Sequence, residues 1–459
     1  MEKFLQEAVS VVPSKRQLAW FDMGFYAFIH FGVNTFTDSE WGTGDEPESI
    51  FNPEKLDCDQ WVRAIKAAGM RGMILTAKHH DGFCLWPSEY TEHSVKNSPL
   101  GIDVVREAAE ACKRGGIKFG FYLSPWDRNS KLYGTDAYND YFCNQLTELL
   151  TQYGDIFCVW FDNACGEGPN GRKQKYDFPR YFELIRKYQP NAVIFNDFGP
   201  DVRWVGNEAG ATRECEWAVV PSELCKYSEI QTGPAPMAEK GDISFLYNTA
   251  KNIGTLDTVM FSKGLTFTPA EVDTSIRKGW FWHKEEEPKS LEELYQIYLR
   301  SVGGNCCLNL NIPPTKEGLL DERDVKRLEE LGELIRRSFE KEIPTTLKKR
   351  EKGDVFQQEY EIIFDIPCSS VHYVAIEEDL TRGQRMEGFQ ILKESEGFEL
   401  FPVYDGRTVG NRKICELWDI SKEQNPLLFG DEDKVLDHLV LRILSSRGEV
   451  YLKNVKVFL

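Results

Sequence analysis

The sequence has no run of apolar residues that approaches the roughly 18 needed for a membrane-spanning helix. Residues Met1 to Arg16 also lack the apolar core of a signal peptide. The twelve cysteines contain no CxxC pair and no regular spacing, which is unlike a secreted disulfide framework. Several, such as Cys112 and Cys143, fall inside predicted helices, where a free thiol behaves as a small hydrophobe. We therefore expect a cytoplasmic protein, or a secreted or periplasmic one if a leader was removed.

Positive charge is also scarce in this chain. Its 55 Lys and Arg residues are outnumbered by 73 Asp and Glu residues, which gives a formal net charge of −18. A strongly acidic protein repels phosphate backbones and anionic lipid headgroups. We therefore expect no nucleic-acid partner and no membrane partner, and a neutral or cationic ligand fits better.

Aromatic residues, by contrast, are plentiful. The chain has 29 Phe and 11 Trp, and ten of the Trp precede residue 290. Sugar rings carry apolar C–H faces that pack against aromatic rings, so this concentration favours a carbohydrate ligand. An aromatic-rich core explains the same composition equally well, and composition alone leaves both interpretations open.

At 459 residues the chain is long enough for two domains, and its first part alternates between strand and helix patterns. The segment 156–161 is an apolar run between helix-like segments at 138–153 and 177–188. Such short apolar runs are typical of parallel strands buried on both faces. Further strands are predicted over 25–31, 71–78, 117–123, 192–195 and 305–312, and helices over 59–69, 102–114, 291–301 and 322–339. This alternation predicts an α/β fold, a (β/α)8-like TIM barrel.

The second half of the predicted barrel is irregular, with short strand candidates at 202–208, 217–220, 257–261 and 265–267. After about residue 345 the segments become short, β-branched or aromatic, and separated by Gly, Asn and charged residues, which is typical of a small all-β sandwich. We expect a barrel domain over 1–342 and a β-sandwich domain over 343–459, with a linker rich in Lys, Glu and Thr near 342–354. Trp418 is the sole Trp of the second part, so we expect this second part to support the barrel and not to carry the catalysis.

Polar side chains follow the predicted strands at the points where these strands end. They are His30 after the first strand, His79 and His80 after the second, Tyr122 near the end of the third and Asp162 after the fourth. The carboxyl ends of barrel strands converge on one mouth, so these residues should become neighbours. A single His at a strand end is more often structural, whereas three of them with a Tyr and an Asp indicate a functional site.

A metal centre is one chemistry that this set could serve, because His30, His79 and His80 could supply imidazole nitrogens. Against it, neighbouring residues on an extended backbone point to opposite sides, so His79 and His80 could not easily bind the same ion. The sequence also contains no HxH and no HExxH motif. We expect no metal and no other cofactor.

Glycoside hydrolysis is the second chemistry, and it requires two carboxyl groups with different roles. One must be ionised to attack or stabilise the anomeric carbon, and the other must hold a proton for the leaving oxygen. Asp162 suits the first role. The candidates for the second are Asp197, Asp201, Glu208, Glu214 and Glu216. Glu208 stands out because its segment, 204–210, is bracketed by glycines and begins with a Trp, although spacing alone leaves it one of five.

Four motifs in this order resemble those of glycoside hydrolase family 29, the α-L-fucosidases. They are Phe-Ile-His-Phe-Gly at 28–32, Ala-Lys-His-His-Asp-Gly-Phe at 77–83, Tyr-Leu-Ser-Pro-Trp-Asp at 122–127 and Val-Trp-Phe-Asp at 159–162. The resemblance spans most of residues 18–310. It implies a retaining hydrolase on a (β/α) barrel with a C-terminal β-domain, and it requires no cofactor.

The resemblance also implies roles for individual residues. It makes Asp162 the nucleophile and assigns fucose binding to His30, Trp41, His79, His80, Tyr122, Trp160 and Trp280, with core packing as the alternative for Trp280. The segment 204–210 is similar to that of the branch selective for α-1,3 and α-1,4 linkages, where the Glu of this motif is the acid/base, here Glu208. The expected substrate is then a fucosylated, branched oligosaccharide, and retention would separate the two carboxyl groups by about 5 to 5.5 Å.

Two other functions remain open on the sequence. One is a retaining hydrolase for another deoxy or galacto-configured sugar. The other is a non-catalytic carbohydrate-binding barrel, which is disfavoured because both candidate carboxylates are present. The sequence does not predict the oligomeric state.

Overall fold

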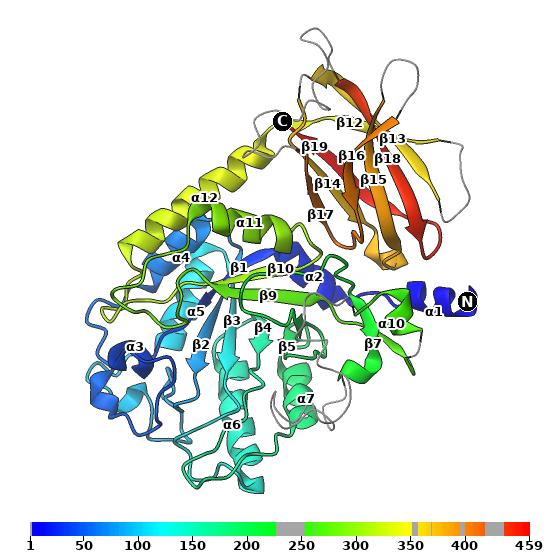
Figure 1. The fold of residues 1–459 in the computed structure, drawn as a ribbon. Coiled ribbons are helices and arrows are strands. Elements are labelled where there is room, and N and C mark those ends of the chain that lie inside the picture. Colours follow the sequence, from blue (N-terminus) through cyan, green and yellow to red (C-terminus); the bar gives the residue numbers. More distant parts are fainter. Residues whose placement is uncertain are drawn as a thin grey trace.

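Eight parallel strands form a barrel in the first part of the chain (Figure 1). The computed structural model describes residues 2–225, 253–260, 262–350, 357–368, 370–394, 400–417 and 436–459. The barrel strands are β1 (Phe25–Ile29), β2 (Gly72–Lys78), β3 (Lys118–Leu123), β4 (Ile156–Trp160), β5 (Val193–Phe195), β6 (Arg203–Trp204), β9 (Ala270–Ser275) and β10 (Cys307–Asn311). They lie in the order β5-β4-β3-β2-β1-β10-β9-β6, and a parallel bridge between Phe195 and Val202 joins the two end strands. The predicted barrel is therefore confirmed.

The first part of the chain also contains helices, and several of them cover the outer side of the barrel strands (Figure 1). They are α1 (Glu2–Ser10), α2 (Lys15–Met23), α3 (Val33–Thr37), α4 (Cys58–Ala67), α5 (Val104–Gly115), α6 (Asp136–Gln152), α7 (Phe178–Tyr188), α10 (Leu256–Val259), α11 (Leu291–Ser301) and α12 (Glu322–Glu340). Helix α4 shows why such segments fold this way: it buries Trp61 and Ile65 on one face. Its N-cap is Asp57, whose carboxylate accepts a hydrogen bond from the Gln60 backbone N–H at 2.9 Å.

Two parts of the irregular half differ from the sequence prediction. The segment 257–261 was expected to be a strand, but Leu256–Val259 forms helix α10, and Phe261 lies outside the described residues. Strand β9 was not predicted, because Glu271 and Asp273 interrupt its apolar pattern. Both carboxyl side chains are buried in the structure. This barrel strand therefore carries acidic residues at buried positions, where a strand of a parallel sheet usually has hydrophobic ones. The candidates at 217–220 and 265–267 form β7 (Val219–Pro221) and β8 (Leu265–Phe267), an antiparallel pair outside the barrel.

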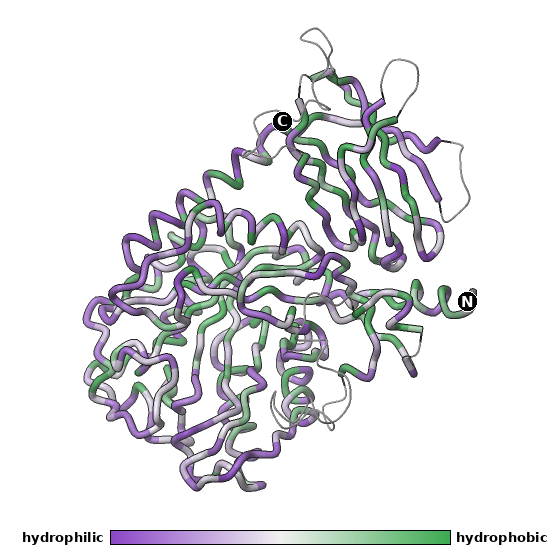
Figure 2. Tube along the Cα trace, viewed as in Figure 1, coloured by the Kyte–Doolittle hydropathy of each residue, from purple (hydrophilic) through white to green (hydrophobic). Residues whose placement is uncertain are grey.

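Two antiparallel sheets make up the second part of the chain (Figure 1). One contains β11 (Glu342–Ile343), β19 (Leu452–Phe458), β14 (Tyr373–Glu378) and β17 (Lys413–Glu416). The other contains β12 (Thr345–Arg350), β13 (Glu359–Cys368), β18 (Leu436–Ser446), β15 (Met386–Glu394) and β16 (Leu400–Gly406). Apolar side chains from both sheets form one core, and in Figure 2 hydrophobic and hydrophilic residues alternate along these strands.

The transition between the two parts falls where helix α12 gives way to strand β11. Within the segment expected as a linker, residues 342–350 contain β11 and β12 instead, and β11 pairs with the last strand of the chain, while 351–354 lie outside the described residues. The division into 1–342 and 343–459 stays a prediction, and Trp418 lies outside the described residues.

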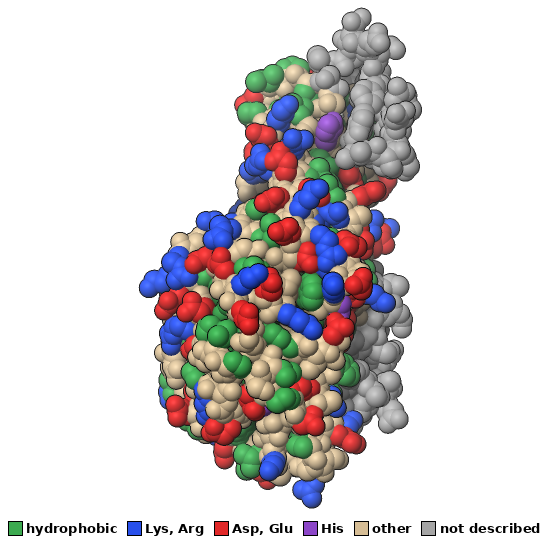
Figure 3. All heavy atoms as spheres, turned by 90° about the vertical axis from the view of Figure 1, so that its left-hand side faces the viewer, with side chains coloured by type: hydrophobic (Ala, Val, Ile, Leu, Met, Phe, Trp, Pro, Cys, Tyr) green, Lys and Arg blue, Asp and Glu red, His purple; other side chains and the backbone are tan. Residues whose placement is uncertain are grey.

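The composition led to expectations about charge, cysteines and membrane spans, and the structure can be compared with each of them. On the face drawn in Figure 3, basic and acidic side chains are mixed over both parts of the molecule. All twelve cysteines belong to the described residues and are free thiols. Across the helices of the described ranges, none combines the length and the apolar character that a bilayer crossing requires. The compartment in which the protein works stays a prediction.

Candidate active site

A cavity of about 190 Å³ lies at the carboxyl ends of the barrel strands. Its lining residues are Phe28, His30, Glu40, Trp41, His79, His80, Tyr122, Trp160, Asp162, Glu208, Asp273 and Trp280. All nine residues predicted to form the site are in this set. The structure therefore brings together residues that are up to 250 positions apart in the sequence (Trp280 and His30), because the ends of parallel barrel strands meet at one mouth.

Asp162 lies two residues after β4, and two donors fix its carboxylate. The Ala164 backbone N–H donates to Oδ1 at 2.7 Å, and the Tyr122 hydroxyl donates to Oδ2 at 3.1 Å. Its side chain keeps 28% exposure, so one side of the carboxylate is open toward the cavity. A carboxylate held in one orientation next to open space is well placed to meet a ligand atom.

His79 and His80 both line the cavity, which corrects the expectation that they point to opposite sides. Strand β2 ends at Lys78, and the chain then turns, with the Gly82 N–H bonded to the His79 carbonyl oxygen at 3.1 Å. The alternation of an extended strand therefore stops before these residues, and their ring centroids lie 4.1 Å apart.

A buried ion pair supports the strand end that carries these two histidines. Lys78, the last residue of β2, places its Nζ 3.0 Å from Asp127 Oδ2 and 2.9 Å from Gln145 Oε1. The other carboxylate oxygen of Asp127 accepts the backbone N–H groups of Asn129 at 3.0 Å and Ser130 at 2.8 Å. Both charged side chains are almost fully buried, and these extra hydrogen bonds are what make a buried pair tolerable.

The three imidazoles of the cavity are neutral at neutral pH. Burial lowers the pKa of His30 to about 3, and burial together with the neighbouring His80 and His30 lowers the pKa of His79. Burial also lowers the pKa of His80, against the opposing effect of Asp162. A neutral imidazole has one N–H donor and one acceptor nitrogen, so the partners of each ring assign its tautomer.

His30 and His80 carry their proton on Nδ1. The Asn311 Oδ1 atom accepts from His30 Nδ1 at 2.8 Å. The Ser124 hydroxyl donates to the Trp126 carbonyl oxygen and therefore accepts from His80 Nδ1 at 2.7 Å. This leaves the Nε2 atom of both rings as an acceptor. His79 has the opposite tautomer, because the Asn34 amide donates to its Nδ1 at 3.4 Å. The set offers two acceptors and one donor.

Glu208 is the second carboxyl group of the cavity, and it lies in the loop after β6. The Thr274 hydroxyl donates to its backbone carbonyl at 2.7 Å, and Trp280 Nε1 donates to its side-chain Oε2 at 3.2 Å. Burial first, and then the charges of Asp162 and Glu40, raise the pKa of Glu208, while the Trp280 hydrogen bond lowers it. A carboxyl group with a raised pKa can hold a proton for a leaving group.

The other four carboxyl candidates lie elsewhere among the described residues. Asp201 forms ion pairs with Arg16, at 3.0 Å, and Arg186. Glu216 pairs with Arg203 and Arg213. Glu214 pairs on the surface with Arg407, and Asp197 is half-buried and does not line the cavity. Burial and the neighbouring Asp162 raise the pKa of Asp197. Of the five, Glu208 alone lines the same cavity as Asp162.

The floor of the cavity is made of aromatic rings above a buried carboxyl group. Trp160 stacks on Phe195 with ring centroids 4.1 Å apart, and its Nε1 donates to Glu271 Oε1 at 2.8 Å. The Tyr26 hydroxyl also donates to Glu271. Burial raises the pKa of Glu271 to about 7, although these hydrogen bonds oppose the shift. Glu271 thereby fixes the orientation of the Trp160 indole.

Trp41 and Trp280 form the mouth of the cavity. Trp41 is 61% exposed, and its ring lies 5.9 Å from that of His80. Trp280 is held by Glu40, whose Oε2 accepts the Trp280 backbone N–H at 2.8 Å. The ring of Trp280 lies 5.0 Å from that of His30. Trp280 therefore lines the cavity and also packs against a core cluster of the barrel, so both alternatives describe part of its surroundings.

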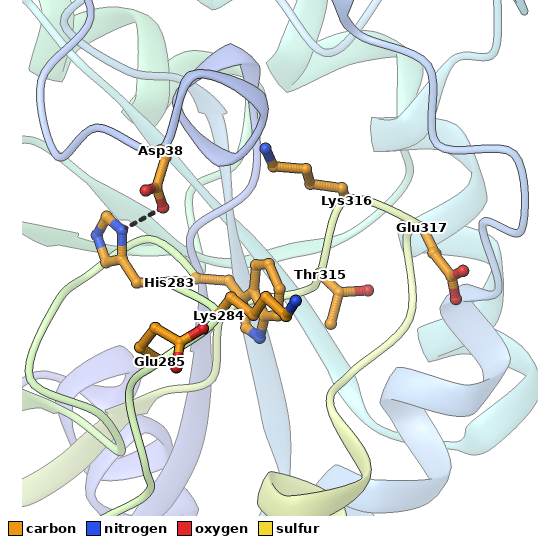
Figure 4. A pocket seen from close by; sticks show the side chains of 8 residues that line it. Asp38, His283, Lys284, Glu285, Thr315, Lys316 and Glu317 are labelled. Carbon is orange, nitrogen blue, oxygen red and sulfur yellow. Dashed lines mark hydrogen bonds and ion pairs between the residues drawn. The ribbon is translucent and has the colours of Figure 1, made fainter.

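A second hollow, of about 700 Å³, is drawn in Figure 4. It is lined by Asp38, Trp282, His283, Lys284, Glu285, Thr315, Lys316 and Glu317. His283 links the two spaces, because its Nδ1 lies 2.7 Å from Asp38 Oδ1 and its Nε2 lies 2.7 Å from Glu40 Oε1. Trp280 and Trp282 thus stand two residues apart on one loop, one lining the cavity and the other lining the hollow.

Sequence reasoning did not select Phe28, Glu40 and Asp273, which also line the cavity. Glu40 could have been found, since it directly precedes Trp41 in the sequence. Asp273 could not, because strand β9 was not recognised. Trp204 Nε1 donates to Asp273 Oδ1 at 2.6 Å. Burial first, and then the charges of Glu271 and Glu208, raise the pKa of Asp273. Within the described ranges, no group of three or more His, Cys, Asp or Glu side chains could hold a metal ion.

Two carboxyl groups on one aromatic-walled cavity are what the hydrolysis of a glycosidic bond requires, so the fold and site define a barrel glycoside hydrolase. The family model described as alpha-L-fucosidase matches residues 45–340. Alpha-L-fucosidase 1 of Arabidopsis thaliana is 39% identical over 464 residues, which cover 94% of this chain and 87% of that relative. The chain belongs to the α-L-fucosidase family and is a glycoside hydrolase.

Other relatives and solved structures agree. A protein of Oryza sativa named as an α-L-fucosidase is 38% identical and covers 88% of this chain and 79% of that relative. A glycoside hydrolase 29 family member from an unknown rumen bacterium has a TM-score of 0.80 at 38% identity, covering 98% of this chain and 77% of that chain. A Ruminococcus gnavus GH29 fucosidase, solved in complex with fucose, has a TM-score of 0.79 at 27% identity, covering 98% and 95%.

Proposed function

We propose that the protein is a retaining exo-α-L-fucosidase that releases terminal α-1,3- or α-1,4-linked fucose from branched oligosaccharides. The observation that carries this proposal is the pairing of Asp162 and Glu208 on one cavity. Asp162 is held open to the cavity as the nucleophile, and the raised pKa of Glu208 suits an acid/base. The carboxyl separation of about 5 to 5.5 Å that retention requires stays a prediction.

The reaction proceeds in two displacements. In the first, a carboxylate oxygen of Asp162 bonds to the anomeric carbon of fucose while the bond to the leaving oxygen breaks. Glu208 gives its proton to that oxygen, and a fucosyl ester of Asp162 forms. In the second, the Glu208 carboxylate takes a proton from water, the water oxygen bonds to the anomeric carbon, and Asp162 leaves as a carboxylate. The sugar keeps its anomeric configuration.

The neutral imidazoles bind the fucose ring through its hydroxyl groups. The Nε2 atoms of His30 and His80 accept hydrogen bonds from sugar hydroxyl groups, and the Nε2–H of His79 donates one. Such a mixed set orients the sugar, because a hydroxyl group both donates and accepts. Tyr122 and the indoles of Trp41, Trp160 and Trp280 complete the binding set. The apolar faces of Phe28 and Trp160, whose ring centroids lie 5.2 Å apart, suit the methyl group that fucose carries in place of a 6-hydroxyl.

Two features support the branched substrate. The segment 204–210, which carries Glu208, resembles the α-1,3/1,4-selective branch of the family. The hollow beside the mouth has a larger volume than the cavity and contributes an indole, that of Trp282, together with polar side chains. In this proposal the cavity holds the fucose ring, and the hollow receives sugars of the oligosaccharide to which fucose is attached.

Substitution of the nucleophile tests the mechanism. Asp162→Ala removes the atom that attacks the anomeric carbon, so hydrolysis of a nitrophenyl fucoside should be abolished while the melting temperature and fucose binding by calorimetry change little. Asp155→Asn is a matched control at the opposite end of strand β4, where the side chain is exposed, and should keep full activity. Near-normal turnover by Asp162→Ala would show that another residue is the nucleophile.

A substrate pair tests the linkage preference. We expect a 1,3/1,4-fucosylated trisaccharide to be hydrolysed with a kcat/KM roughly tenfold or more above that of a 1,2-fucosylated lactose. A nitrophenyl glycoside panel, run beside it, distinguishes fucose from other deoxy or galacto-configured sugars. A preference for the 1,2-linked substrate would refute the linkage assignment and weaken the assignment of Glu208.

A further inference from the structure

The segment that carries Glu208 is anchored by a buried ionic cluster. This Glu208 segment comprises residues 203–218. Glu216, 2% exposed, pairs with Arg203 and Arg213. Arg213 Nη1 also donates at 2.7 Å to the carbonyl oxygen of Val205, three residues before Glu208, and Arg203 Nη2 donates to the Trp217 carbonyl at 3.1 Å. The cluster thus connects both ends of the segment through ion pairs and hydrogen bonds.

The β-sandwich domain bonds directly to the C-terminal end of this segment. Gln384, which is buried, accepts the Ala218 backbone N–H at 2.9 Å. Asn305 joins the two domains: its Nδ2 donates to the Glu216 carbonyl at 2.8 Å, and its Oδ1 accepts the Asn411 backbone N–H at 2.7 Å. The hydrogen bonds of these buried groups have defined geometry, so they fix the position of the segment against the sandwich.

Arg447 makes a further contact between the domains. It lies in the loop between β18 and β19, and its side chain has 0% exposure. The guanidinium centre stands 3.5 Å from the ring centroid of Trp217, and Nε lies 3.1 Å from Glu387 Oε1. Arg447 Nη2 donates to the Gly254 carbonyl oxygen. A Cβ atom at Gly254 would lie 2.1 Å from Trp217 Cβ, so the Trp217 side chain is packed closely on that side as well.

We propose that the β-sandwich domain holds the acid/base of the barrel in place, and that Arg447 is the positioning residue that does so. Arg447 contacts Trp217, Trp217 is the next-to-last residue of the Glu208 segment, and the cluster around Glu216 transmits the constraint to Glu208. Arg447 itself does not line the cavity. A planar, permanently charged guanidinium suits this role, because it stacks on an indole while its fork bonds in fixed directions. The inference rests on the proposed role of Glu208 as acid/base.

A comparison of leaving groups tests this inference. The kcat/KM of a retaining hydrolase reports the first displacement, in which protonation by Glu208 matters for a sugar leaving group and hardly for an acidic phenol. We expect Arg447→Met to lower kcat/KM for the fucosylated trisaccharide roughly tenfold to hundredfold, because small displacements of catalytic groups have effects of this size. The kcat/KM for dinitrophenyl fucoside should change by no more than about threefold, because that leaving group needs almost no protonation. Arg447→Lys should give an intermediate ratio.

Two comparison variants make the result interpretable. Arg407→Ala removes an exposed ion pair with Glu214 that crosses the same domain boundary, and it should leave both rates unchanged, since surface pairs contribute little. Glu208→Gln should show the selective loss of the trisaccharide activity. If Glu208→Gln loses both activities equally, the proposed acid/base fails, whatever Arg447 does.

The results for the Arg447 variants decide whether Arg447 positions Glu208. If Glu208→Gln shows the selective loss but Arg447→Met loses both activities equally, or neither, Arg447 does not position Glu208 and the inference is wrong. If Arg447→Met does not fold, Arg447→Lys and Gln384→Met are judged by the same ratio of the two kcat/KM values. A selective loss in them supports the inference, and an equal loss overturns it.

Discussion

Replacing Trp280 with Phe should raise the pKa of Glu208 and move the alkaline side of the pH–activity profile to higher pH. The Trp280 Nε1–H donates to Glu208 Oε2 at 3.2 Å. A hydrogen bond to a carboxylate stabilises its ionised form, so this contact lowers the pKa of Glu208 against the raising effects of burial, Asp162 and Glu40. Phe keeps an aromatic ring at the cavity mouth and removes the donor.

The size of the shift follows from the geometry. A hydrogen bond to a charged group contributes about 1.5–3 kcal/mol when water is excluded. Glu208 is exposed to solvent, so water screens the contact and replaces the lost donor, which reduces the contribution to about 0.5–1 kcal/mol. One pKa unit corresponds to about 1.36 kcal/mol, and the expected rise is therefore roughly half a unit.

The measurement is the pH dependence of kcat/KM for the fucosylated trisaccharide, whose leaving group needs the proton of Glu208. Activity should fall as pH rises through the pKa of Glu208, because the acid loses its proton, and the midpoint of this fall should lie about half a unit higher in Trp280→Phe. Trp282→Phe is the matched control, since its Nε1 donates to Asp321 at 3.1 Å and not to Glu208. An unchanged or lowered midpoint in Trp280→Phe would refute the reasoning.

Two further predictions concern the hollow and the stability of the fold. Trp282→Ala should raise KM for the trisaccharide and leave kcat/KM for an aryl fucoside unchanged, measured by initial rates; an equal effect on both substrates would show that no sugar binds in the hollow. Asp127→Ala leaves the Lys78 ammonium buried without its partner, so the free energy of unfolding in urea should fall by about 3–5 kcal/mol. A loss below about 1 kcal/mol, the scale of an exposed ion pair, would contradict the importance of this pair.

Much of the fold could be predicted because the signal was local. Segments such as 72–75 and 156–160 are short apolar runs, and strands buried on both faces of a parallel sheet are rich in such runs. Strand β9 was not predicted because it lacks such an apolar run. The carboxyl group of its Glu271 accepts hydrogen bonds from Trp160, Tyr26 and Asn309, three residues from other strands. These partners are brought together only by the fold, so the local sequence around Glu271 could not indicate them.

The candidate site was predictable to the same extent. His30, His79, His80, Tyr122 and Asp162 follow strand ends, and the convergence of strand ends in a barrel is a general property of that fold. Placing both adjacent histidines on the cavity required the turn after Lys78, which the strand pattern did not reveal. The five later carboxyl groups were indistinguishable by spacing, and they differ in the structure because arginines pair with three of them.

By itself, the sequence determined the barrel, the sandwich that follows it and the strand ends on which the site is built, because hydrophobic periodicity and the order of motifs are properties of neighbouring residues. The tertiary structure alone decided that Glu208 shares a cavity with Asp162, that Trp280 faces that cavity, and that the second domain bonds to the segment carrying Glu208. These outcomes depend on how loops and domains pack at long range, where the position of a side chain is set by partners hundreds of residues away.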